Sequence, residues 1–398
     1  MRVLVITPWY PTRDQPHAGV FVREQAKSAL ASGEEVAVLH VSEANAGLRG
    51  PWRMEREDDL DLTEGIPTYH LFSRSFRLRL LPRRVANAPA LLISCCLSAV
   101  AAVAGFRRLR RAGFRPEVIH AHVYTAGLQA VIIGKLFRVP VVITEHYTRF
   151  PQRTLPTGGR TMARLAFKGA ARVMPVSVAL QKAIEDYGIS ARFEVVPNAV
   201  DPSVFYPGKR RRTRGEPCKL IFVGGLESTH HKGFPTLLEA LTTLRDKRTD
   251  WQLQVVGDGP SRTDYESRVA RAGMESWIVF RGAKTKREIA EMMRGSDAFV
   301  LSSRVETGPC VVMEAMASGL PVVATRVGDV SSMVSDRDGL VVAPEDPGAL
   351  ADALDRVLSS LGFYDRGEIS ARARDRYGLA SVGARLSAIY RSVLSPRS

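Results

Sequence analysis

Residues 301–324, LSSRVETGPCVVMEAMASGLPVVA, constrain the fold more than any other run of this chain. The apolar stretches at both ends predict buried β-strands, and the Thr-Gly-Pro between them predicts a turn. The residues from 310 onward predict a helix. A helix that begins at the carboxyl end of a parallel strand directs its first, unpaired amides above the sheet, where they form a ready site for a phosphate.

Two carboxylates frame this turn. Glu306 lies in the loop, and Glu314 lies about one turn into the helix. Carboxylates on both sides of a phosphate can accept hydrogen bonds from sugar hydroxyls. The segment therefore favours a ligand in which a phosphate joins two polyols, such as a nucleotide-sugar. The alternative is a pair of ordinary solvated carboxylates, since the spacing alone is common.

The same alternation of apolar strands and helices runs through the whole chain. In the first half we expect strands at residues 3–7, 36–41, 118–121, 139–144, 173–176 and 193–196. After a linker at 197–218, strands are expected at 219–223, 253–256, 277–281, 298–301 and 321–324. Such Val- and Ile-rich runs between helices are typical of parallel sheets covered on both faces.

The chain has 398 residues, too many for one typical core. We therefore expect an α/β fold with two doubly wound, Rossmann-like parallel-sheet domains. The first domain is expected at residues 1–200 and the second at 201–380. A last helix is expected within 381–398.

The sequence argues against a signal peptide, disulfide bonds, a zinc site and a membrane span. Residues 1–8 predict a first strand that stops at Pro8 rather than a signal peptide. The four cysteines have no Cys-x-x-Cys spacing, which argues against disulfides and zinc and indicates a cytoplasmic protein. Residues 88–106 carry no charge and are about as long as a short membrane span, but their Ala, Ser and Cys content favours a buried helix.

The net charge of +15 is concentrated in arginine clusters, at 74–84, 107–111 and 209–214. One interpretation is solvated surface. Another is contact with an anionic membrane surface, because Phe and Leu residues alternate with the first cluster. No nucleic-acid motif accompanies the charge, so a nucleic-acid partner is not expected. The candidate membrane contacts are Arg74, Arg77, Arg79, Arg83 and Arg84.

The Glu306-x7-Glu314 pair, followed by Ala-Met-Ala-x-Gly-x-Pro-Val-Val-Ala-Thr, resembles glycosyltransferase family 4, the retaining enzymes with the GT-B fold. The resemblance covers nearly the whole chain. It implies an acceptor-binding domain and a nucleotide-sugar-binding domain that face a cleft, with the last helix crossing back to the first domain. It also implies a hexosyl- or related glycosyltransferase, which moves a sugar from a nucleoside diphosphate to an acceptor hydroxyl.

The resemblance assigns roles to residues of the second domain. Lys232 neutralises the leaving diphosphate, Glu306 contacts the donor sugar, and Glu314 binds the ribose hydroxyls. The turn Thr307-Gly308-Pro309 replaces a more common form of the family loop.

The phosphates are expected at the start of the helix that follows this turn. Pro309 suits the first helical position, and the amides of Cys310 and Val311 would face the phosphates. The family usually has Gly-Arg-Leu at a second turn, where this chain has Gly225 in place of the arginine. Either His230, His231 or an arginine elsewhere compensates, or the diphosphate binds more weakly than usual.

In the first domain, His122 matches the family histidine that lines the donor-sugar and acceptor site. His146 ends the next strand and is a second candidate on the acceptor side. Gly19 falls in the loop before the first helix, where the family glycine lets the backbone approach the diphosphate. Residues 7–19 and 144–157 are expected to select the acceptor.

The interpretation is thus a retaining glycosyltransferase of polysaccharide or glycolipid biosynthesis in the cell envelope, cytoplasmic or peripheral on the inner face of the membrane. No metal or cofactor is implied, because the acidic run at 58–61 lies away from the phosphate elements and suits a surface loop. Two alternatives stay open. A nucleotide-sugar epimerase would use the same fold without an acceptor, and a non-catalytic module would bind lipid or nucleic acid through its arginines.

Overall fold

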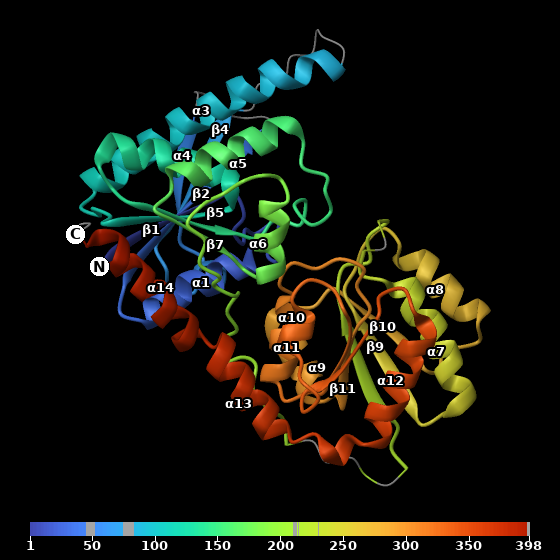
Figure 1. Cartoon of the computed structure of the whole chain (residues 1–398). Coiled ribbons are helices and arrows are strands. Elements are labelled where there is room, and N and C mark those ends of the chain that lie inside the picture. Colours follow the sequence, from blue (N-terminus) through green and yellow to red (C-terminus); the bar gives the residue numbers. More distant parts are fainter. Residues whose placement is uncertain (45–51, 75–82, 210–212, 214, 230, 396–398) are drawn as a thin grey trace. The chain divides into compact units, whose positions relative to one another are not determined.

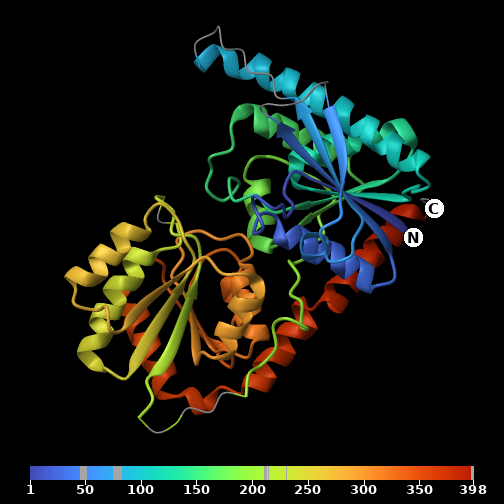
Figure 2. The same ribbon diagram turned by 180° about the vertical axis from the view of Figure 1, so that it is seen from behind.

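The computed structural model describes residues 1–44, 52–74, 83–209, 213, 215–229 and 231–395, without the side chains of 43, 44, 74 and 83–96. The chain divides into two compact units, one of residues 1–198 with 379–398 and one of residues 199–378. Each unit has its own hydrophobic core of buried residues. Figures 1 and 2 show an α/β arrangement in each unit, with helices on both faces of a central sheet.

The first unit is built on a mixed sheet. In its described part the strand order is β3-β4-β2-β1-β5-β6-β7, and all neighbouring pairs are parallel except β3 and β4. The strands are β1 (Arg2–Thr7), β2 (Glu35–Ala44), β3 (Trp52–Glu57), β4 (Thr68–Arg74), β5 (Val118–His122), β6 (Val141–Glu145) and β7 (Arg172–Pro175).

The helices of the first unit cover both faces of this sheet. They are α1 (Val20–Ala31), α2 (Leu60–Thr63), α3 (Arg83–Arg111), α4 (Val123–Phe137), α5 (Thr157–Gly169), α6 (Val178–Glu185) and α14 (Leu379–Leu394). Figure 1 shows α3, α4 and α5 on one face and α1 with α14 on the other. The hydroxyl of Tyr390 on α14 lies 2.7 Å from Nδ1 of His120 on β5, and Ser387 donates a hydrogen bond to Glu34.

The second unit has a parallel sheet, with the strand order β10-β9-β8-β11-β12-β13 in its described part. The strands are β8 (Cys218–Val223), β9 (Trp251–Val256), β10 (Ile278–Gly282), β11 (Ala298–Leu301), β12 (Val322–Thr325) and β13 (Gly339–Val342). The helices are α7 (Phe234–Lys247), α8 (Arg262–Arg271), α9 (Lys286–Arg294), α10 (Cys310–Ala317), α11 (Val330–Met333), α12 (Pro347–Ser359), the 3-10 helix η1 (Leu361–Phe363) and α13 (Arg366–Tyr377).

Three local expectations were wrong. The first sheet is not wholly parallel, because the polar strand β3 pairs antiparallel with β4 at the sheet edge. Residues 193–196 make single hydrogen bonds beside β7 and one isolated bridge, from Val173 to Phe193, instead of a strand. The acidic run at 58–61 is not simply a loop, since the carboxylate of Asp59 caps α2.

The helix expected at residues 88–106 extends over Arg83–Arg111, and its outer side is exposed, with Val100 62% exposed. No helix in the described part of the chain is both long and apolar enough to cross a membrane. Of the predicted membrane contacts, Arg77 and Arg79 lie outside the described residues, as do the side chains of Arg74, Arg83 and Arg84.

Candidate active site

The donor-side residues lie at the switch point of the second sheet. The strand order reverses between β8 and β11, and ligands of open α/β sheets bind at the carboxyl ends of the strands on either side of such a reversal. Gly224 and Gly225 follow β8, and the loop after β11 contains Glu306. The fold thus brings residues that are 80 positions apart to one edge of the sheet.

Lys232 and Glu306 form an ion pair across this edge. Nζ of Lys232 lies 2.7 Å from Oε1 of Glu306, and the hydroxyl of Ser303 donates to the same oxygen at 2.7 Å. The side chain of Glu306 is 9% exposed and that of Lys232 is 22% exposed, so both charges interact more strongly than they would in water. A cation and an anion are therefore held side by side in defined orientations.

Gly233 determines where Lys232 is placed. It is the N-cap residue of α7 with φ +65°, and a Cβ at this position would lie 1.8 Å from the carbonyl oxygen of Ser302. Only glycine accommodates both the left-handed conformation and this close approach. The loop after β11 and the start of α7 are consequently in backbone contact beside the ion pair.

The start of α10 supplies the amides that the sequence predicted. The helix begins at Cys310, and Pro309 is its N-cap residue, so the prediction that Pro309 occupies the first helical position was one residue off. Cys310 and Val311 are the first two helical residues, whose amides have no carbonyl partner within a helix. Burial raises the pKa of the Cys310 thiol to about 12, with smaller contributions from Glu314 and Glu306. Both carboxylates therefore lie close to the first turn of α10.

No arginine stands at Gly225, and His231 does not replace its charge. A Cβ at Gly225 would meet Oε1 of Glu227 at 3.1 Å, a tight contact with the end of a flexible side chain, so a larger residue fits there only if Glu227 shifts. The pKa of His231 is lowered, first by burial and then by Lys232, which keeps the imidazole neutral at neutral pH. Lys286, at the start of α9, is close enough to Cys310 to lower the pKa of the thiol. It is a second cation near this site, which the sequence interpretation missed; His230 lies outside the described residues.

The first unit holds its candidate residues at the switch point of its own sheet, between β1 and β5. His122 ends β5, and its Nδ1 lies 2.9 Å from Nε2 of His146, which follows β6. The two rings stack at 5.2 Å with an angle of 13° between their planes. Nε2 of His122 is buried and has no hydrogen-bond partner among the described residues. This nitrogen can therefore bind a ligand.

Burial keeps these imidazoles neutral. It lowers the pKa of His146 to about 3 and that of His122 well below its usual value. A hydrogen bond in which the His146 ring donates to the side chain of Asn198 raises the pKa of that ring, because an amide oxygen accepts a proton. His146 then accepts from Nδ1–H of His122, which leaves a lone pair on Nε2 of His122. That nitrogen can accept a hydrogen bond from a hydroxyl group.

Backbone geometry fixes the position of His122. Val123, the next residue, has φ +63°, an outlier for a β-branched side chain and a sign of strain at a functional site. The carboxylate of Glu145 accepts hydrogen bonds from the amides of Tyr124, His146 and Tyr147 at 2.8–2.9 Å. Glu145 therefore ties the ends of β5 and β6 together. The sequence interpretation missed it, although it lies directly before His146.

Gly19 lies in the first unit, beside the His122 and His146 pair. It is the N-cap residue of α1 with φ +64°, and a Cβ there would lie 2.3 Å from the carbonyl oxygen of Trp9. Phe21, two residues later, packs on His146 with ring centroids 4.5 Å apart. The loop after β1 and the start of α1 thus join the histidines in one aromatic cluster.

A pocket of about 460 Å³ adjoins this cluster at the start of α4. Pro8, Tyr124, Gln129 and Met162 are among its lining residues, and Arg149 lies at its edge with the guanidinium 5.5 Å from the centroid of the Tyr147 ring. Arg149 belongs to the segment 144–157, which was expected to select the acceptor. The first unit therefore offers a mainly apolar pocket with one cation at the start of the helix that follows His122.

Comparisons with known proteins find matches along most of the chain. A model of "Glycosyltransferase Family 4" matches residues 2–204, and a model of "Glycosyl transferases group 1" matches residues 217–360. D-inositol 3-phosphate glycosyltransferase of Arthrobacter sp. (strain FB24) is 30% identical over 369 residues, which is 86% of this chain and 83% of that protein. The putative teichuronic acid biosynthesis glycosyltransferase TuaC of Bacillus subtilis (strain 168) is 26% identical over 380 residues, 89% of each chain.

Among solved structures, Anabaena Alr3699/HepE in complex with UDP has a TM-score of 0.72 at 18% identity, over 98% of this chain and 100% of that chain. The two α/β units and the similarity to this structure show the GT-B fold. The chain belongs to glycosyltransferase family 4. The predictions of fold class, family and sugar-transfer activity are therefore confirmed.

Proposed function

We propose that this glycosyltransferase moves a sugar from a nucleoside diphosphate to an acceptor hydroxyl with retention of anomeric configuration. The observation that carries the proposal is the meeting of Lys232, Glu306 and the first amides of α10 at one switch point. Lys232 and the amides of Cys310 and Val311 hold the diphosphate, and the α10 dipole adds positive potential. Crystals of the Anabaena protein contain UDP or UDP-glucose, which supports a nucleotide-sugar donor here.

In the proposed reaction, the bond from the anomeric carbon to the diphosphate oxygen breaks, and a bond to the acceptor oxygen forms on the same face of the sugar. The acceptor proton passes to the leaving diphosphate. Since a diphosphate leaves readily, catalysis rests on positioning and on electrostatic stabilisation of the departing charge. Because protein groups supply that stabilisation, we propose that no metal ion takes part. A chelator in the transfer assay is expected to leave the rate unchanged.

The candidate residues of each unit then have a defined task. Glu306, oriented by Lys232 and Ser303, accepts hydrogen bonds from the donor sugar, and Glu314 accepts from the ribose. In the first unit, Nε2 of His122 accepts a hydrogen bond from a sugar hydroxyl, which gives this buried nitrogen the partner that it otherwise lacks. His146 sets the tautomer of His122 and does not itself touch substrate.

For the acceptor we propose a polysaccharide or glycolipid of the cell envelope, used at the cytoplasmic face of the membrane. The support is the similarity to a putative teichuronic acid biosynthesis enzyme and the mainly apolar pocket, lined in part by Arg149, at the start of α4. A transfer assay with radiolabelled donor and envelope extracts tests this. Sugar interconversion without any glycan product would instead identify an epimerase.

A thermal-shift panel with UDP, GDP and ADP tests the donor site. A ligand at 100 times its dissociation constant stabilises by about 2.7 kcal/mol, which corresponds to roughly 5–10 °C for a unit of this size. We expect a shift with one diphosphate, lost in Glu314→Ala and retained in the matched control Glu291→Ala on the exposed side of α9. The absence of a shift with every nucleotide would contradict the proposal.

A further inference from the structure

The net positive charge of the chain arises from one region. Residues 65–184 contain nineteen Lys and Arg residues against two acidic residues, Glu117 and Glu145, a net charge of +17 where the whole chain carries +15. This region includes α3, α4 and α5, and none of these helices contains Asp or Glu. Because these helices cover one face of the first sheet, that face is strongly basic (Figure 1).

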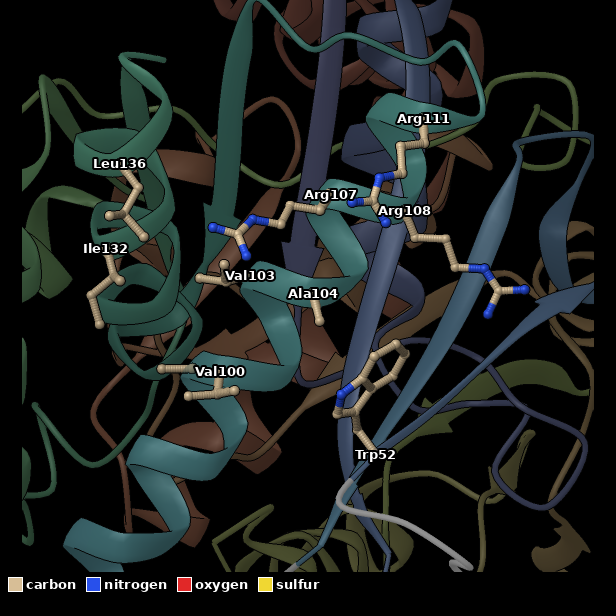
Figure 3. A pocket seen from close by; sticks show the side chains of 10 residues that line it. Trp52, Val100, Val103, Ala104, Arg107, Arg108, Arg111, Ile132 and Leu136 are labelled. Atoms are coloured by element: carbon tan, nitrogen blue, oxygen red, sulfur yellow. The ribbon is translucent and has the colours of Figure 1, made fainter.

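An apolar groove of about 570 Å³ lies on this basic face, on the outer sides of α3 and α4. Val100 and Val103 of α3 and Ile132 and Leu136 of α4 line it, and Figure 3 shows the two valines directed toward α4. Val100 is 62% exposed and Leu136 is 60% exposed. Large apolar side chains gathered in a groove on a surface are typical of a binding site.

Three arginines line the same groove: Arg107, Arg108 and Arg111. Their side chains are exposed, and none forms an ion pair with a carboxylate of the described residues. The guanidinium of Arg107 lies 5.8 Å from the ring centroid of Phe137 on α4, which keeps the charge at the groove. Figure 3 shows Arg107 directed toward α4 and Arg108 toward the opposite side of α3. The groove therefore combines an apolar interior with three guanidiniums.

We propose that this groove docks the enzyme on a bilayer that contains anionic lipid, with an acyl chain between α3 and α4 and the lipid phosphate on the arginines. Guanidiniums bind phosphate in bidentate geometry, and basic residues near an anionic bilayer attract it. A nucleic acid would use the charge but not the apolar interior. The inference rests on the membrane location in the proposed function, and it names the surface and the class of lipid.

Flotation with vesicles at physiological salt tests the groove. One set contains phosphatidylglycerol and phosphatidylcholine, the other phosphatidylcholine alone. We expect wild type to float with the anionic set only. Neutralising two charges in Arg108→Gln/Arg111→Gln should weaken binding on the order of 25-fold, since each basic residue contributes about fivefold. Removing apolar contact in Val100→Ser/Leu136→Ser should weaken it on the order of tenfold.

Matched controls separate the groove from general effects of charge and exposure. Arg287→Gln/Arg385→Gln removes two exposed arginines outside the basic region, and Phe363→Ser removes an apolar side chain that is 68% exposed in the second unit. Both controls should float as wild type does.

Three outcomes overturn the inference: no flotation of wild type, equal flotation with both vesicle sets, or loss in the arginine variant with full binding by the serine variant. Loss in the arginine variant alone would show that the protein adsorbs through its charge and not through the apolar groove, as it would on a nucleic acid. The UDP thermal shift should persist in every groove variant. Its absence from wild type, with lipid binding intact, would count against the proposed function and not against the groove.

Discussion

The first unit should lose stability in mild acid, because it buries histidines in their neutral form. Burial lowers the pKa of His40 to about 4 and those of His120 and His146 to about 3, and it lowers that of His122 well below its usual value. In an unfolded chain each would bind a proton near pH 6.5. Between pH 6.5 and 4 the unfolded state therefore holds more protons, and the free energy of unfolding falls as the pH falls.

The magnitude follows from the number of groups. Each histidine contributes about 1.4 kcal/mol per pH unit, so four contribute roughly 5.5 kcal/mol per unit around pH 5. Between pH 4.5 and 7 Glu145 makes the free energy of unfolding rise as the pH falls, because burial raises its pKa to about 7 and the folded state then holds the extra proton. The net slope is about 4 to 5 kcal/mol per pH unit. Since domain stability is roughly 5–15 kcal/mol, the first unit should unfold within about three pH units below 6.5.

Urea unfolding followed by circular dichroism, repeated in steps from pH 7 to pH 5, measures this slope. His40→Asn removes one buried histidine and should lower the slope by about 1.4 kcal/mol per pH unit. His17→Asn is the matched control, because the side chain of His17 is exposed, and it should leave the slope unchanged. A stability independent of pH over this range, or an unchanged slope in His40→Asn, would refute the argument.

Three further substitutions test the site. Gly225→Arg restores the family clamp at a position where the flexible side chain of Glu227 has to shift, and calorimetry should show about tenfold tighter UDP binding. Equal affinity would contradict the role of the missing charge. Gly233→Ala should lower the free energy of unfolding of the second unit by about 3 kcal/mol, because its Cβ would meet the carbonyl oxygen of Ser302. A melting temperature within 2 °C (about 1 kcal/mol) of wild type would be inconsistent with that contact. Glu145→Gln leaves one backbone amide, such as that of Tyr124, without its hydrogen-bond acceptor. The free energy of unfolding, followed in thermal melts, should fall by about 1–3 kcal/mol, and the transfer rate should fall as well. Stability equal to that of wild type would show that the carboxylate is dispensable.

The fold was largely predictable because most of its strands are continuous apolar runs that belong to buried parallel sheets. The expected strand at 298–301 coincides with β11, and that at 219–223 differs from β8 by one residue. The edge strand β3 escaped prediction, because Met54 is its one buried residue and its other positions are polar or partly exposed. A hydrophobic pattern in the sequence indicates which residues are buried. An edge strand with a solvated face has few buried residues, so its pattern is weak.

Site residues that belong to a local sequence motif could be predicted. Residues that act through partners elsewhere in the sequence could not. The resemblance named Lys232 and Glu306, and the structure places their charged atoms 2.7 Å apart. Glu145 and Lys286 belong to no motif, since each also acts on a residue more than about 20 positions away, Tyr124 and Cys310 respectively. The left-handed conformation of Val123 likewise has no sequence signal, because a β-branched residue disfavours it.

The position of α14 has a consequence for synthesis of the chain. The first unit is discontinuous, with residues 1–198 completed by 379–398, whereas the second unit is one continuous segment. On the ribosome, at roughly 5–20 residues per second, α1 must wait about 20–70 s for the helix that covers it, while the second unit folds as soon as it emerges. Nascent chains stopped before Tyr390 therefore carry an uncovered α1 and a His120 without its tyrosine partner. The last turns of the C-terminal helix decide when the N-terminal unit becomes native.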